Sequence, residues 1–89
     1  MNETEQAFID ALPDEQADRL LVQLAGAAMQ RKLEIASVLR GRGGWHRSDC
    51  SEGYLRELLA EHVVKGDLVD VMNLAAMIYA RQQLYGKRD

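Results

Sequence analysis

LVDVMNLAAMIY (Leu68–Tyr79) decides the fold of this 89-residue chain. Ten of its twelve residues are apolar, and only Asp70 and Asn73 interrupt the run. Its Leu, Met and Ala residues favour helix, so the stretch predicts a helix over about 68–85. Because such a helix is apolar nearly all round, it must be covered on every side. One short chain has too little protein for this, so we expect a homo-oligomer, a dimer or tetramer, that associates through the C-terminal helix.

The rest of the chain also favours helix, since it holds one Pro and few β-branched residues. A short helix over about 4–12, with Thr4 as N-cap, precedes a long helix from Pro13 to about Arg40. The GRGG run at 41–44 ends that helix and opens a loop of about ten residues. A third helix follows and ends near Lys65; Asp49 and Glu52 form a capping box for it, although Ser48 and Ser51 are alternative caps.

Gly66 and Asp67 predict a sharp turn between the third and fourth helices, with Gly66 as C-cap and Asp67 as the next N-cap. The predicted fold is therefore all-α: a small helical bundle of three main helices plus a short N-terminal helix. Residues 1–89 form a single domain.

Charge is distributed unevenly along the chain, whose net charge is −3. Residues 1–18 carry six acids and no base, and residues 31–47 carry five bases against Glu34, a net +4. Residues 48–70 return to −4, with six acids against two bases. The acidic total argues against a nucleic-acid partner. The basic segment followed by the acidic one has two possible readings. Either both are solvated helix faces, or they form a site where Lys and Arg side chains bind phosphates and carboxylates bind a metal.

The single Cys50 excludes a disulfide within the chain and favours a reducing compartment. The N-terminus is acidic and polar, unlike a secretory signal, and no apolar run is long enough to span a bilayer. We therefore expect a cytoplasmic protein without a membrane partner.

Five acidic or amide residues are candidate metal ligands or their neighbours. Asp67, Asp70 and Asn73 share one side of the last helix, at spacings of three. Glu57 and Glu61 line one face of the helix before it. If Gly66 lets the two helices pack together, the carboxylates converge as the oxygen shell that Mg²⁺ requires. The alternatives are that Asp67 and Asp70 cap the last helix, and that the glutamates form a solvated face.

The loop after the long helix carries candidate nucleotide ligands. Lys32, Arg42 and Arg47 suit phosphates, and Trp45 suits a stacked base or, equally, an ordinary packing contact. Gly43 and Gly44 allow a ligand to approach the backbone closely.

Three segments, KLEIASVLRGRGGW (32–45), CSEGYLRELLAEHV (50–63) and GDLVDVMNLAAMIYAR (66–81), together resemble the small phage-encoded MazG-like proteins. These are relatives of the all-α nucleoside triphosphate pyrophosphohydrolases, and the resemblance covers about residues 29–81. It implies helical dimers or tetramers in the cytoplasm of a bacterial host. It also implies an ExxE and an ExxD motif that hold Mg²⁺, which activates water to release pyrophosphate.

The resemblance assigns roles residue by residue. Asp70 matches the acid of ExxD, Asp67 replaces its glutamate, and Asn73 matches an asparagine one turn later. Glu61 matches the second acid of ExxE, whereas Leu58 stands at the first position beside Glu57. Together with the candidates identified above from the residues themselves, the expected catalytic residues are Glu61 and Asp70, the expected metal ligands Glu57, Glu61, Asp67 and Asp70, and the expected nucleotide-binding residues Lys32, Arg42, Trp45, Arg47 and Asn73.

The segment between the two acidic motifs is shorter than in the working enzymes, and one acid of ExxE is replaced. These departures favour a phage or prophage protein that binds a nucleotide or a host protein without a need for catalysis. The alternative is a Mg²⁺-dependent (deoxy)nucleoside triphosphate pyrophosphohydrolase that uses Glu61, Asp67 and Asp70.

Overall fold

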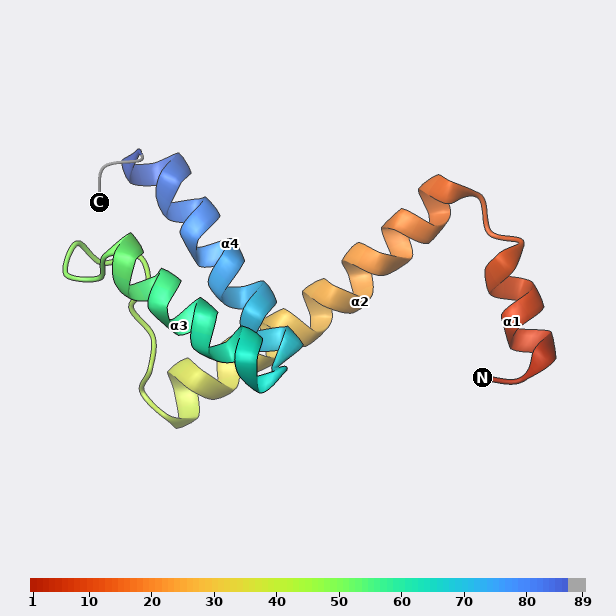
Figure 1. Cartoon of the computed structure of the whole chain (residues 1–89), viewed down its shortest axis with the longest axis horizontal. Coiled ribbons are helices and arrows are strands. Elements are labelled where there is room, and N and C mark those ends of the chain that lie inside the picture. The colour runs from red at the N-terminus through yellow and green to blue at the C-terminus, as the bar shows by residue number, and fades with distance from the viewer. Residues whose placement is uncertain (87–89) are drawn as a thin grey trace.

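The computed structural model describes residues 1–86, and every regular element in that part is helical. The elements are α1 (Glu3–Asp10), α2 (Asp14–Glu34), a π-helical turn η1 (Ile35–Leu39), α3 (Glu52–Lys65) and α4 (Leu68–Tyr85), as Figure 1 shows. The all-α class is confirmed. The last three residues of the single domain expected over 1–89 lie outside the described part.

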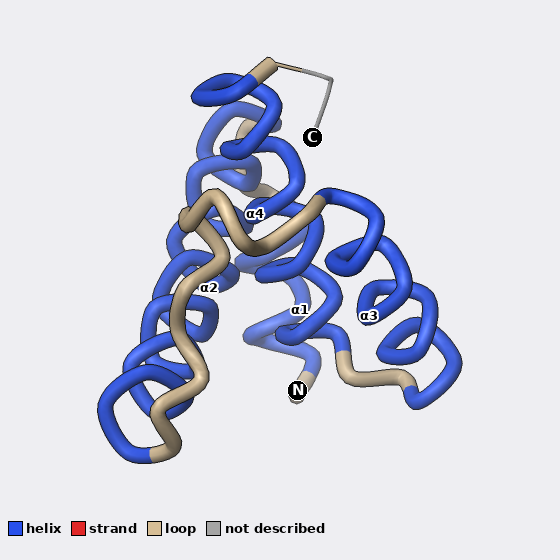
Figure 2. Tube along the Cα trace, turned by 90° about the vertical axis from the view of Figure 1, so that its left-hand side faces the viewer, coloured by secondary structure: helices blue, strands red, loops and turns tan. Residues whose placement is uncertain are grey.

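The apolar helix α4 packs on two sides, against α3 and against the C-terminal half of α2 (Figure 1 and Figure 2). The buried core consists of Leu55 from α3 with Leu74 and Ile78 from α4. Half-buried side chains pack around it: Cys50, Leu58, Leu59 and Met77. We name this part of the molecule, residues 25–86, the body.

The N-cap of α1 differs from the sequence prediction, and the N-cap of α3 is one of the predicted alternatives. Asn2 caps α1 instead of Thr4, because its Oδ1 accepts the Glu5 N–H at 2.8 Å. Ser51, one of the alternatives, caps α3, and its Oγ accepts the Tyr54 N–H at 3.1 Å. Gly66 is the predicted C-cap of α3, with a φ of +78° that suits glycine.

Residues 1–24 project from the body as an N-terminal arm (Figure 1). Within the described residues α1 packs closely against no other helix, and the molecule measures 50 × 28 × 24 Å. Phe8 is 68% exposed, and Leu21 and Leu24 are each 64% exposed. The expected bundle is therefore complete only for α3, α4 and the second half of α2.

The C-terminal turns of α4 hold the loop that follows η1. Arg81 is 1% exposed, and its Nη1 donates to the Trp45 carbonyl at 2.7 Å and to the Arg47 carbonyl at 2.9 Å. One turn later the Tyr85 hydroxyl donates to the His46 carbonyl, and the Arg81 guanidinium lies 4.9 Å from the centre of the Tyr85 ring. The backbone of three successive loop residues is thus fixed by a single helix.

A polar contact also joins α4 to the start of α3. Gln82 Nε2 donates to Glu52 Oε1 at 2.9 Å, and Arg56 Nε donates to Glu52 Oε2 at 2.8 Å. The hydrogen bond from Arg56, followed by the one from Gln82, lowers the pKa of the Glu52 carboxyl. The carboxylate therefore stays ionised where it links the two helices.

We predict that Arg81→Met destabilises the protein by about 2–4 kcal/mol, because two charge-assisted hydrogen bonds to loop carbonyls are lost. Urea unfolding followed by circular dichroism measures the change. Arg56→Met is the control, since an exposed arginine in a surface pair contributes at most about 1 kcal/mol. Equal losses for the two variants would contradict the role given to Arg81.

Candidate functional site

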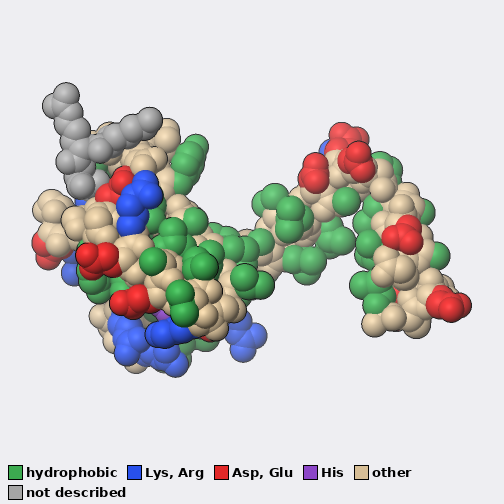
Figure 3. Space-filling view, in the orientation of Figure 1, with side chains coloured by type: hydrophobic (Ala, Val, Ile, Leu, Met, Phe, Trp, Pro, Cys, Tyr) green, Lys and Arg blue, Asp and Glu red, His purple; other side chains and the backbone are tan. Residues whose placement is uncertain are grey.

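A half-open cleft of about 1130 Å³ lies between the loop after η1 and the packed helices. Its apolar floor comes from three helices and consists of Leu33, Leu55, Leu58, Leu74 and Met77. The loop supplies the polar side of the lining, with Arg42, Trp45, His46, Arg47 and Asp49. Lys and Arg side chains gather at the edge of the body where η1 meets this loop (Figure 3). The cleft therefore joins an apolar floor to a cationic, aromatic rim.

The loop takes its shape from backbone hydrogen bonds between residues that line the cleft. The Arg42 N–H donates to the Ala36 carbonyl at 2.8 Å, and the Arg47 N–H donates to the Gly44 carbonyl at 3.1 Å. Gly44 has a φ of +104°, a backbone conformation that side chains disfavour. A Cβ at this residue would lie 3.4 Å from Arg47 Nη1, so the guanidinium of Arg47 folds back over Gly44. Glycine at 44 thus positions Arg47.

Three of the five residues expected to bind a nucleotide line this cleft: Arg42, Trp45 and Arg47. Trp45, the only tryptophan of the chain, is half-buried, and its ring meets the His46 ring edge-on at 5.7 Å between centroids. The other two expected residues, Lys32 and Asn73, are outside the cleft lining and belong to the contact between α2 and α4.

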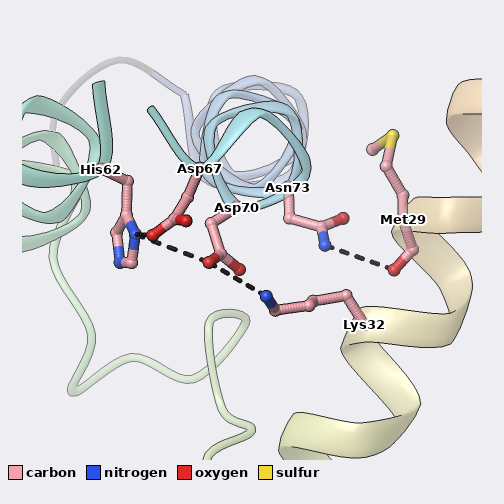
Figure 4. Close-up of polar contacts among 6 residues, drawn as sticks. All are labelled: Met29, Lys32, His62, Asp67, Asp70 and Asn73. Carbon is pink, nitrogen blue, oxygen red and sulfur yellow. Dashed lines mark hydrogen bonds and ion pairs between the residues drawn. The ribbon is translucent and has the colours of Figure 1, made fainter. Parts of the chain in front are cut away.

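A polar cluster adjoins the cleft at the turn between α3 and α4 (Figure 4). His62, which also lines the cleft, has its Nδ1 3.2 Å from Asp67 Oδ2 and 3.5 Å from Asp70 Oδ2. Lys32 Nζ reaches across from α2 to lie 3.3 Å from the same Asp70 oxygen. Asp67 occupies the predicted N-cap position of α4, but its carboxylate makes no capping hydrogen bond to the helix.

Asn73 links α4 to α2 just beyond this cluster. It is 4% exposed, and its Nδ2 donates to the Met29 carbonyl at 3.2 Å (Figure 4). The amide therefore makes a buried polar contact between α2 and α4. Its side chain serves the packing of α2 on α4.

Among the described residues, His62, Asp67 and Asp70 form the group that could hold a metal, with ligand atoms within 4.8 Å of one another. Two of the four expected ligands are in it, whereas Glu57 and Glu61 are exposed on α3 outside it. His62 was not among the expected ligands, and the signal for it in the sequence is its place one turn before the Gly66 break. Mg²⁺ prefers oxygen ligands, and here one donor is an imidazole and Asp70 already pairs with an ammonium. This donor set does not fit Mg²⁺.

No protein-family model, no curated protein and no solved structure matches this chain. Within residues 1–86, no helix has the length and apolar character needed to cross a bilayer.

We predict that Gly44→Ala destabilises the protein by about 1–2 kcal/mol, because alanine is strained at positive φ. The strained residue directly precedes Trp45 in the chain, so the fluorescence spectrum of Trp45 should change. Gly26→Ala is the control: Gly26 is helical with no atom within 4 Å of an added Cβ, so alanine should stabilise by up to about 1 kcal/mol. A stabilising Gly44→Ala would contradict the described loop conformation.

Proposed function

We propose that this chain is a small helical protein, related to the phage MazG-like proteins, that binds a nucleotide in the cleft beside residues 41–50. The observation that carries the proposal is the composition of the cleft. Two arginines and the only tryptophan stand at the rim of an apolar floor. Ligand sites typically combine mostly apolar walls with a few well-placed polar groups in this way.

Each part of a nucleotide has a chemically suitable partner in the cleft. Guanidinium groups bind phosphate oxygens through paired, charge-assisted hydrogen bonds, which suits Arg42 and Arg47. An indole ring stacks on a base, which suits Trp45, and the leucine floor suits the apolar faces of the base. The net +4 of residues 31–47 attracts a small anion locally, while the acidic remainder repels a long polyanion.

Binding without catalysis is the reading that the polar cluster supports. The carboxylates of Asp67 and Asp70 are already paired with His62, and Asp70 also with Lys32. A metal ion would have to replace the Lys32 ammonium at Asp70. We therefore assign no metal-dependent step, and the proposed activity is retention of a nucleotide in the cytoplasm of a bacterial host.

The proposal retains a homo-oligomer as the functional unit. The predicted association surface is the C-terminal helix, and α4 leaves Leu68 72% and Tyr79 64% exposed. Leu84 of the same helix is 67% exposed, so α4 keeps exposed apolar side chains at both of its ends although α3 and α2 already pack against it.

We predict that nucleoside triphosphates, titrated in EDTA, quench the fluorescence of Trp45 in a saturable way. Arg42→Gln and Arg47→Gln should each weaken binding about tenfold or more, because each removes charge-assisted contacts to phosphate. Arg56→Gln is the matched control, since Arg56 pairs with Glu52 outside the cleft lining. The free nucleoside should bind more weakly than the triphosphate. No saturable quenching, or equal weakening in the control, would overturn the proposal.

One observation favours the second candidate, the pyrophosphohydrolase: the convergence of His62, Asp67 and Asp70 beside the cleft. We expect no pyrophosphate release from nucleoside triphosphates with Mg²⁺ or Mn²⁺, and no difference between wild type and Asp70→Asn. Release that Asp70→Asn and Glu61→Gln abolish, and that Glu57→Gln retains, would establish the hydrolase with Glu61 as a ligand. Release lost in Asp70→Asn alone would establish the His62–Asp67–Asp70 group instead.

A further inference from the structure

The single chain exposes far more surface than a compact protein of its size. Its accessible area is 7045 Å², whereas a compact monomer of this mass exposes about 5200 Å². Its radius of gyration is 16.2 Å, against about 12 Å for a compact domain of this length. The N-terminal arm accounts for the elongation, since it projects from the body (Figure 1). Each chain therefore exposes about 1800 Å² more than a compact monomer of its mass.

Two exposed leucines and two half-buried alanines form a stripe along α2, whereas the exposed Val22 lies on another side of the helix. Ala17, Leu21, Leu24 and Ala28 recur at spacings of three and four, so they lie on one side of the helix. The two leucines are each 64% exposed, and the two alanines are half-buried. Small side chains beside the leucines let another helix approach closely. This stripe has the dimensions and character of one half of a helix–helix interface.

The charges of α2 show what kind of partner fits the stripe. The helix begins with Asp14, Glu15 and Asp18, and its C-terminal end carries Arg31, with Arg40 following η1. A second α2 laid antiparallel places each acidic end beside a basic end, and a two-fold axis makes both contacts at once. An unrelated protein would have to supply both charge patterns, whereas the chain itself already carries both.

We propose that two copies of this chain pair through α2, antiparallel and related by a two-fold axis. The excess exposed area of two chains, about 3600 Å², is larger than the roughly 2000 Å² at the lower end of the area that permanent homodimers bury. This surface differs from α4, which is already packed between α3 and α2. The pairing does not depend on nucleotide binding, so either proposal can fail without the other.

Sedimentation equilibrium of the purified full chain tests the pairing. Wild type should sediment at twice the chain mass, and Leu21→Glu/Leu24→Glu should sediment at the mass of one chain. The matched control is Leu68→Glu/Tyr79→Glu, which adds the same charge at similarly exposed positions of α4 and should remain a dimer. A monomeric wild type overturns the proposal. So does a control that dissociates while Leu21→Glu/Leu24→Glu stays dimeric, since α4 would then be the interface.

A charge exchange tests the antiparallel orientation and does not depend on the leucine variant folding. Asp14→Lys/Glu15→Lys/Asp18→Lys makes both ends of α2 basic, and Arg31→Glu/Arg40→Glu makes both ends acidic. At low salt each variant alone should dissociate at least about tenfold more readily than wild type, and an equimolar mixture should associate. A mixture that associates no better than its components overturns the antiparallel arrangement.

Discussion

The burial of α4 on two sides is the constraint on which the rest of the structure depends. Leu74 and Ile78 meet Leu55 of α3, while Asn73 reaches the Met29 carbonyl of α2. Because the same helix also buries Arg81, the loop after η1 is attached to the core and not merely to its neighbours in sequence. The cleft exists because one helix packs against two others and holds the segment that connects them.

The amino-acid sequence predicted which residues form helices better than it predicted what each helix packs against. The apolar run at 68–79 and the glycine at 66 indicated α4 and its turn, because local composition and backbone freedom decide both. Composition and capping residues also predicted α1 and α2, but they carry no information on what covers these helices, and the arm is uncovered within one chain. The convergence of acids across the turn was predicted for Asp67 and Asp70, but Glu57 and Glu61 remain exposed on α3. His62 joins the cluster instead. Its approach to the aspartates depends on the angle between α3 and α4, which local composition does not reveal.

The three basic side chains that were expected to bind phosphate lie in two different places. Lys32 lies against Asp70, where its charge balances a carboxylate, whereas Arg42 and Arg47 line the cleft. Sequence grouped all three as phosphate ligands because they share a basic segment. The separation arises because Lys32 projects from the packed half of α2 toward α4, while the arginines follow the helix end. His62 borders both the cluster and the cleft, so a ligand in the cleft would lie beside the neutralised acids.

Helix ends fray, and the residues that hold the loop lie in the last two turns of α4. When those turns unwind, the Trp45, His46 and Arg47 carbonyls lose their donors together. Loop residues 45–47, which form the rim of the cleft, therefore open in the same event in which the last two turns of α4 unwind. Amide hydrogen exchange in the final turns of α4 and in residues 45–47 should share one opening rate, and a molecule held in the cleft would slow exchange in both segments.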